Sequence, residues 1–349
     1  MVHTQRESGI ELLRIFAAFG VVFSHFLNLG GIFGSDQINY SSYMVMTLIR
    51  SITIASVDIF VIITGFFLST NQVRSLGKPL SLLFQVSIYS VIFTIAFYLI
   101  GKTDLSIRGI LFSLLPSNWF VTLYVVLYII FPYLNFYLVN LKYETWIYYL
   151  SIVLVLFSLL PMFLGIADHL GLSLQGLSTY GFGGNNAGYT LVNFITLYSI
   201  GAFCRLNEIE KKVKSLHLLF IAAVCILILW GIRFIPLNTK PWHIAGWYDN
   251  IFVLTLASCL FLIFKKLNFN SFVINSLSAA AFTCYIIQGY CLKMVSIDTI
   301  LCYPLHKSLA VIAIFIICTY LFAFCIYYFY TSVFGSFFNK LDKKRIQLI

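Results

Sequence analysis

The sequence predicts an all-α protein, a polytopic membrane bundle of about ten transmembrane helices with both termini in the cytoplasm. Three observations support this fold class. The 349 residues are 60% hydrophobic and only 10% charged, with a mean hydropathy of +0.94. Long apolar stretches recur along the whole chain, and basic residues gather in alternate loops. A water-soluble domain carries about 25% charged residues, so this chain cannot cover a water-facing surface.

Each membrane crossing needs about 20 mostly apolar residues. Glu11 and Arg14 lie inside the first such stretch, and no small-x-small cleavage site follows Leu29, so we expect a retained helix rather than a signal peptide. The last stretch is long enough for a tilted helix plus an interfacial turn, and we expect residues 1–349 to form one integral-membrane domain. The apolar stretches are 9–29, 43–70, 79–100, 118–139, 145–165, 188–206, 215–235, 247–265, 273–296 and 306–334.

Basic residues set the expected orientation. With a cytoplasmic N-terminus, 14 of the 22 Lys and Arg residues fall in cytoplasmic segments and six in outer segments, while Arg14 and Arg50 lie within spans. This asymmetry is what the positive-inside rule requires. The net charge of +10 is therefore explained by membrane topology, and no nucleic-acid partner is expected.

The first span contains the string ELLRIFAAFGVVFSH, which carries Arg14 and His25. Eleven residues of helix bring both side chains to nearly one face, about 16 Å apart along the axis. Glu11, one turn before Arg14, is a candidate partner for it. Ionisable groups inside a membrane usually face the bundle interior and carry function. The alternative is a snorkelling Arg14 and an inert interfacial His25.

The second span contains Arg50 and Asp58, which lie two helical turns apart. Both share a broad face but are too distant to pair, so Asp58 needs a partner from another helix. Thr64 and Gly65 follow, and a small residue at this point permits close helix packing. Structural pairing within the bundle is the alternative to a catalytic role for either charge.

The fourth span opens with an aromatic segment that contains Trp119 and Tyr124. Tyr124 and Tyr128 share a helix face, and Pro132 is a potential kink. Trp119 is otherwise typical of the aromatic belt at a membrane interface.

No metal site and no resident cofactor is expected. The histidines outside the spans show no metal-ligand spacing, the eight cysteines form no C-x-x-C motif, and hydrolase, zinc-protease and nucleotide-loop motifs are absent from the sequence. The glycine-rich segment 180–188 reads as a flexible outer loop.

Over nearly its whole length, the chain resembles the acyltransferase-3 family, bacterial integral-membrane O-acetyltransferases that modify cell-surface glycans. The resemblance rests on several strings in order: Arg14-x10-His25, VDIFVIITGFF in the second span, and WFVTLYVVLYIIFPYLN in the fourth. The later strings NFITLYSIGAFCR and LSAAAFTCYIIQ also fit the family.

This resemblance implies a cytoplasmic acetyl-CoA donor, a glycan acceptor and a bacterial cytoplasmic membrane location. It also implies that Arg14 and His25 are essential, and that Arg74 and Lys78 stand near the entrance for coenzyme A. Basic groups at that end suit the phosphates of the donor.

The same resemblance implies that Trp119 and Tyr124 form an aromatic pair near the reaction chamber. One departure concerns the ninth span, where related sequences commonly carry a histidine and this chain carries Gln288. We expect Gln288 to contact substrate. The chain also lacks the extracytoplasmic domain fused to some members, so it resembles the stand-alone form.

The mechanism stays open between two chemistries at His25, which either acts as a general base for the acceptor hydroxyl or carries the acyl group as a relay. Asp58 or Tyr124 is a candidate for orienting His25 or for holding the acceptor. The rival function is a transporter or a flippase of lipid-linked glycan, for which we expect repeats and interrupted helices that the sequence does not show. A polysaccharide polymerase is disfavoured because the longest outer loop, about 166–187, has no Lys or Arg.

Overall fold

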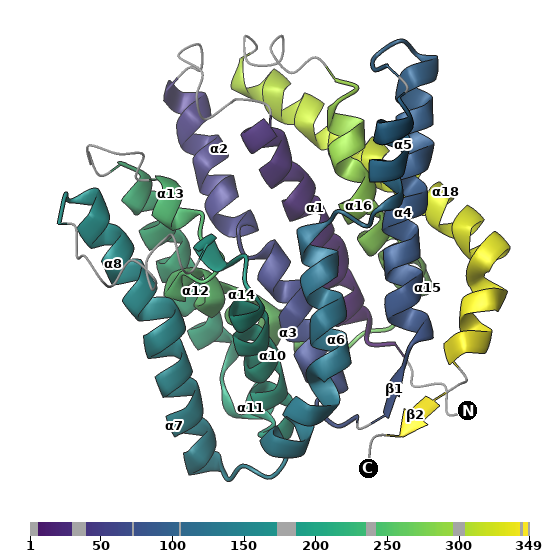
Figure 1. The fold of residues 1–349 in the computed structure, drawn as a ribbon. Helices are drawn as coiled ribbons and strands as arrows, with labels where there is room; N and C mark the ends of the chain where they lie inside the picture. The colour runs from purple at the N-terminus through teal and green to yellow at the C-terminus, as the bar shows by residue number, and fades with distance from the viewer. Residues whose placement is uncertain are drawn as a thin grey trace.

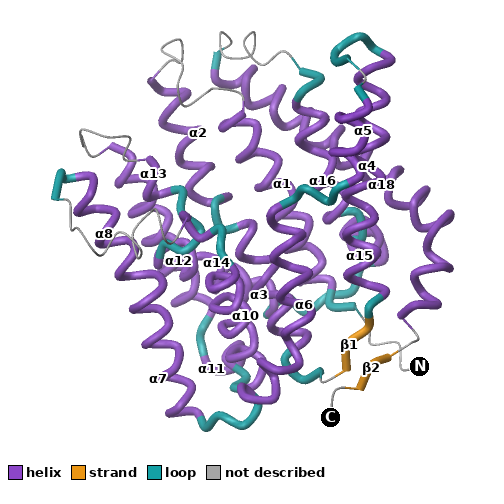
Figure 2. Tube along the Cα trace, viewed as in Figure 1, coloured by secondary structure: helices purple, strands orange, loops and turns teal. Residues whose placement is uncertain are grey.

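The computed structural model describes residues 6–29, 40–71, 73–104, 106–172, 186–234, 242–295, 304–342 and 345–347. Within these ranges the chain is a bundle of helices with one pair of three-residue strands, which confirms the predicted helical membrane fold (Figures 1 and 2). The first half consists of α1 Ser8–Leu29, α2 Tyr40–Thr53, α3 Ser56–Leu68, β1 Val73–Ser75, α4 Gly77–Leu99, α5 Ile107–Leu114, α6 Trp119–Leu138, α7 Tyr143–Leu154, η2 Val155–Leu159 and α8 Leu160–His169. The second half consists of η3 Asn186–Gly188, α10 Leu191–Leu206, α11 Ile209–Lys212, α12 Ser215–Gly231, η4 Ile232–Phe234, α13 Trp242–Ala245, α14 Ile251–Lys265, α15 Phe272–Ser278, α16 Ala281–Leu292, α18 Leu305–Asp342 and β2 Arg345–Gln347.

Seven helices in the described ranges are long and apolar enough to cross a membrane, and the pair α15–α16 makes an eighth if it is counted as one span. Two further predicted spans are the apolar helices α10 and α14, of 16 and 15 residues. Helices of this length reach about 24 Å, less than the hydrocarbon thickness of about 30 Å. The count of ten crossings therefore stays a prediction. The last stretch, which had room for a tilted helix plus an interfacial turn, forms one continuous helix of 38 residues.

Two predicted spans are interrupted. The second divides into α2 and α3, where the hydroxyls of Ser51 and Thr53 bond to backbone carbonyls of the preceding turn, a contact that bends helices. The ninth bends by 50° between α15 and α16, where the Leu277 carbonyl accepts from the Ala280 N–H at 3.0 Å and the Tyr320 hydroxyl at 2.9 Å. The ninth is thus sharply bent, whereas the second still forms one stretch, Tyr40–Leu68, long enough to cross a membrane; neither break contains Gly or Pro.

Several helices begin at side chains that cap their first free amides. Asn118 accepts from Val121 N at the start of α6, and Asn250 accepts from Phe252 N at the start of α14. Ser106 and Thr190 cap α5 and α10 in the same way. These short polar residues satisfy orphan N–H groups that would otherwise be costly inside a membrane.

Helices α3 and α10 pack closest at the centre of the bundle. A Cβ added to Gly65 would lie 2.1 Å from the Tyr198 carbonyl oxygen, and one added to Gly201 would lie 2.2 Å from the Ile62 carbonyl oxygen. Small residues that let helix backbones approach are a common basis of association in membranes. The prediction that Gly65 permits close packing is consistent with this contact.

We expect Gly65→Ala to lower the stability of the folded bundle by about 1–3 kcal/mol, because the methyl group overpacks against a backbone that cannot yield. The measurement is thermal unfolding of the purified protein in detergent. Gly335→Ala in α18 is the matched control, since its Cβ would meet ordinary contact at 3.8 Å. Equal melting temperatures for both variants and the parent would contradict this packing argument.

The beginning of α1 and the strand β2 lie at the same end of the bundle, hereafter the basal end (Figure 1, bottom). Here β1 pairs antiparallel with β2, opposing Ser75 to Arg345, and Ser75 also bonds to Asp342 at the end of α18. Most described basic residues also belong to this end: Arg6, Lys78, Lys142, Arg205, Lys211, Lys212, Lys214, Lys265, Lys266 and Lys340. A cytoplasmic basal end stays the prediction of the positive-inside rule.

Candidate active site

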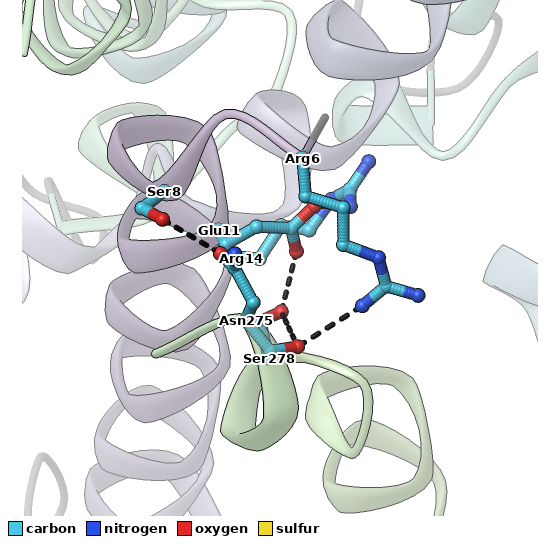
Figure 3. A network of polar contacts seen from close by, with 6 residues as sticks. All are labelled: Arg6, Ser8, Glu11, Arg14, Asn275 and Ser278. Atoms are coloured by element: carbon cyan, nitrogen blue, oxygen red, sulfur yellow. Dashed lines mark hydrogen bonds and ion pairs between the residues drawn. The ribbon is translucent and has the colours of Figure 1, made fainter. Parts of the chain in front are cut away.

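A polar network joins the start of α1 to α15 at the basal end (Figure 3). Glu11 forms an ion pair with Arg14 at 2.8 Å and also accepts from the hydroxyl of Ser278. Arg6 donates to the carbonyl of Asn275 at 3.0 Å. Glu11 is thus held by two partners, while the Arg14 side chain stays 33% exposed, with donors left over for another anion.

Arg14 lines a cavity of about 330 Å³ that extends from charged groups of the basal half to aromatic side chains of α3, α6 and α16. Its charged lining consists of Arg6, Glu11, Arg14 and Lys78. Three cations against one carboxylate give the cavity a net positive charge. Its inner wall carries Tyr124, whose hydroxyl accepts from Thr64 Oγ1 at 3.3 Å.

An aromatic layer closes the inner end of this cavity. Phe120 and Phe282 line the cavity, and Tyr285 packs behind them with ring centroids 5.1 Å and 6.4 Å away. Phe60 also lines the cavity and packs on Phe120. His25 is not among the residues that line the cavity, although it lies on the same helix as Arg14.

His25 pairs with Gln288, one turn beyond Tyr285 on α16. The amide nitrogen of Gln288 faces Nδ1 of His25 in a hydrogen bond. An amide nitrogen only donates, so this orientation makes Nδ1 the acceptor and places the proton on Nε2. Rotating the amide by half a turn would put its oxygen against an Nδ1–H and leave the Nε2 lone pair free. The prediction that Gln288 belongs to the site is consistent with this contact.

Arg50 and Asp58 lie on either side of the break in the second span. Arg50 stands in the last turn of α2 and donates to the hydroxyl of Ser24, next to His25. Asp58 stands in the first turn of α3, fully buried, and neither carboxylate oxygen has a hydrogen-bond partner in the described part of the chain. Each charge suits its helix end, since cations favour C-termini and anions favour N-termini.

Nothing in the described part of the chain connects Asp58 to His25. Asp58 interacts electrostatically with Asp249, whereas His25 interacts with Arg50 and Gln288. A catalytic role for Asp58 therefore stays a prediction without a contact to support it.

Trp119 belongs to an aromatic cluster built from three segments. Its ring lies 4.4 Å from that of Tyr189 and stacks on that of Tyr248 at 5.8 Å, and the rings of Tyr189 and Tyr248 are 5.1 Å apart. Trp119 also contacts Phe120 at 5.9 Å, so the cluster adjoins the aromatic layer of the cavity. Trp119 is thus a packing partner inside the protein rather than an isolated belt residue.

The structure brings the predicted residues together in two groups. Arg14, Lys78 and Tyr124 line the cavity, and His25 pairs with Gln288 beyond it. The backbone of Arg74 forms part of β1, but its side chain lies outside the described residues.

Sequence reasoning missed several residues of the site. Arg6 was counted only as a topology determinant, although it lines the cavity with Arg14. Ser278 and Phe282 line the cavity and belong to the string LSAAAFTCYIIQ, which also carries Gln288. That string was the feature of the sequence from which the two residues could have been predicted. Tyr189 and Tyr248 lie outside any recognisable motif, so only the fold brings them to Trp119.

Among the described side chains, no three His, Cys, Asp or Glu residues stand close enough to hold a metal ion. The side chains of His169 and His243 and most of the glycine-rich segment 180–188 lie outside the described residues. In the described part, Cys204, Cys225, Cys259 and Cys284 are buried free thiols.

Comparison with known proteins identifies the fold family. The family model of the acyltransferase-3 group, described as an acyltransferase domain, matches residues 7–328. No curated protein and no solved structure matches the chain. The match covers nearly all of the bundle, including the His25–Gln288 pair and every residue of the cavity lining except Arg6. The chain therefore belongs to the acyltransferase-3 family of membrane acyltransferases.

Proposed function

We propose that the protein is a bacterial cytoplasmic-membrane O-acetyltransferase. It would move the acetyl group of cytoplasmic acetyl-CoA to a hydroxyl of a cell-surface or lipid-linked glycan, with no resident cofactor. The observation that carries this proposal is the positively charged cavity at the basal end. Helix α1 contributes Glu11 and Arg14 to its lining and also carries His25.

The donor suits the cavity in charge and in reach. Phosphates of coenzyme A would bind Arg14 together with Arg6 and Lys78, since guanidinium groups form charge-assisted and bidentate bonds with phosphate. The thin arm that carries the thioester would extend along α1, and His25 lies about 16 Å further by helix rise.

Chemistry at His25 then needs a proton to be taken up and returned by the imidazole. With the rotated Gln288 amide, whose oxygen accepts from Nδ1–H, the free Nε2 takes the proton of the acceptor hydroxyl while the hydroxyl oxygen attacks the thioester carbonyl carbon. The carbon–sulfur bond breaks, and the imidazolium returns the proton to the leaving thiolate. In the relay alternative, the acetyl group first resides on His25 and then passes to the glycan.

The direct test supplies acetyl-CoA labelled in its acetyl group to membranes that hold the protein and its glycan. Label in an alkali-labile ester of the glycan supports the proposal, and NMR of surface glycan with and without the protein locates the ester. Absence of label from the glycan, with folded protein present, would contradict it.

Gln288 is proposed as a positioning residue, because an amide oxygen that accepts from Nδ1–H would hold the ring in place and leave the Nε2 lone pair free for the acceptor hydroxyl. We expect Gln288→Leu to lower kcat by about 10- to 100-fold, the value of one or two lost hydrogen bonds, with little change in KM for acetyl-CoA. Steady-state kinetics with labelled donor separates these constants.

Rescue distinguishes positioning from packing at this position. Gln288→His restores a ring nitrogen as partner and the residue that related sequences commonly carry, and we expect it to recover most of the lost kcat. If Gln288→Leu keeps full kcat, or if Gln288→His is as impaired as the leucine variant, the positioning role is wrong.

A further inference from the structure

Arg50 is a buried cation with unused donors. It lies in the middle of a membrane span and is 6% exposed. Of its five N–H donors, only one hydrogen bond is formed in the described part of the chain, to Ser24. None of the ion pairs among described residues includes it. The partial negative charge at the C-terminus of α2 partly balances the charge of Arg50. It does not provide hydrogen-bond acceptors for the remaining N–H donors among the described residues.

A second cation adds to this charge. Arg233 in η4 is also 6% exposed and lies close enough to Arg50 for the two to repel each other. An arginine that keeps spare donors in a membrane interior is typical of a ligand site.

The surroundings of Arg50 suit a sugar. The guanidinium lies near the side chains of Tyr189 and Tyr248, which pack around Trp119. Aromatic faces bind the apolar faces of rings and keep polar tips free for hydrogen bonds. Tyr189 is 39% exposed, so the cluster reaches the surface of the protein.

The reacting group stands beside this cluster. Ser24, the hydrogen-bond partner of Arg50, is the residue before His25, and Arg50 also interacts electrostatically with His25. An anionic group at Arg50 would therefore place a neighbouring hydroxyl near the imidazole. Hereafter the Arg50 cluster means Arg50, Trp119, Tyr189 and Tyr248.

We propose that the Arg50 cluster binds an acceptor that carries a carboxylate or a phosphate on the acylated sugar residue or on its direct neighbour. The inference rests on the proposed function and names its substrate class, an acidic glycan. Planar guanidinium groups bind either anion in a bidentate manner, so the two sources share one chemistry.

The test uses the surface glycan of the strain that carries this protein, stripped of O-acetyl groups by mild alkali. Three forms serve as acceptors for the wild-type protein and labelled acetyl-CoA: the glycan as isolated, the glycan with carboxyl groups reduced to alcohols, and the glycan with phosphates removed. We expect neutralisation of the relevant anion to lower kcat/KM at least tenfold. The form that loses activity distinguishes carboxylate from phosphate.

The variant Arg50→Gln should lower kcat/KM for the charged acceptor and bring the charged-to-neutral ratio close to one. If Arg50 only tunes His25 or stabilises the bundle, the variant should lower kcat/KM equally for the charged and the neutral acceptor, and the ratio of the two values should stay high. Binding of acetyl-CoA and the melting temperature report whether the variant is folded, and the wild-type comparison of acceptors holds even if it is not.

Two outcomes overturn the inference. Equal transfer to charged and neutralised glycan by the wild type shows that the anion is not recognised, and so does an acetyl group located by NMR on a neutral residue without acidic neighbours. Both leave the proposed acyl transfer intact. Failure to label any glycan is a different result, which removes the proposed function and the inference with it.

Discussion

His25→Ala is expected to lower acetyl transfer to glycan by about 10²- to 10⁴-fold, the usual contribution of a positioned general base. His25 is the ionisable group on α1 that lies beyond the donor cavity, next to Arg50 and Gln288. Without the imidazole, no described side chain in contact with Gln288 can take the proton of the acceptor hydroxyl. Binding of acetyl-CoA at the basal end should persist, because Arg14, Arg6 and Lys78 are untouched.

The measurement is label transfer from acetyl-CoA in membranes with equal amounts of folded protein. His217→Ala is the matched control, since His217 is exposed at the start of α12 and is not among the residues that line the cavity. A His25→Ala protein with wild-type transfer would remove His25 from the mechanism. A rapid acid quench also separates the two chemistries, because only a relay leaves label on the wild-type protein.

The helical membrane fold was predictable because composition and apolar length determine it directly. The breaks in the second and ninth spans were not, because they coincide with hydroxyl-to-carbonyl bonds of Ser51, Thr53 and Tyr320. Hydropathy counts apolar residues and does not register these bonds. The short helices α10 and α14 show the same limit, since their ends are set by caps at Thr190 and Asn250.

The candidate site was predictable only in part. Arg14 and His25 share a helix, so their spacing followed from helix geometry. The contact between His25 and Gln288 joins residues 263 positions apart, and only packing of α1 against α16 creates it. The aromatic layer of Phe120 and Phe282 could not be inferred either, because its partners come from separate helices and each residue alone is an ordinary apolar side chain.

Arg14→Gln is expected to raise KM for acetyl-CoA by about 10- to 100-fold, with a smaller effect on kcat. A hydrogen bond to a charged group contributes about 1.5–3 kcal/mol, and each 1.4 kcal/mol is tenfold in affinity. Arg14 has spare donors because its ion pair with Glu11 uses one nitrogen in the described structure. Arg14→Lys keeps the charge but loses the planar fork, so we expect a rise of about tenfold.

The partner Glu11 provides a sharper version of this test. In Arg14→Gln the carboxylate of Glu11 keeps its bond to Ser278 but faces the donor phosphates without a neighbouring cation at position 14. Removing that charge as well, in Glu11→Gln with Arg14→Gln, should recover part of the donor affinity, because like charges in the cavity no longer repel. Lys211→Gln is the control, a basal-end cation outside the cavity lining, and its KM should equal that of the parent. Donor KM unchanged in Arg14→Gln would show that phosphates bind elsewhere, and equal KM in the single and double variants would show that Glu11 does not oppose the donor.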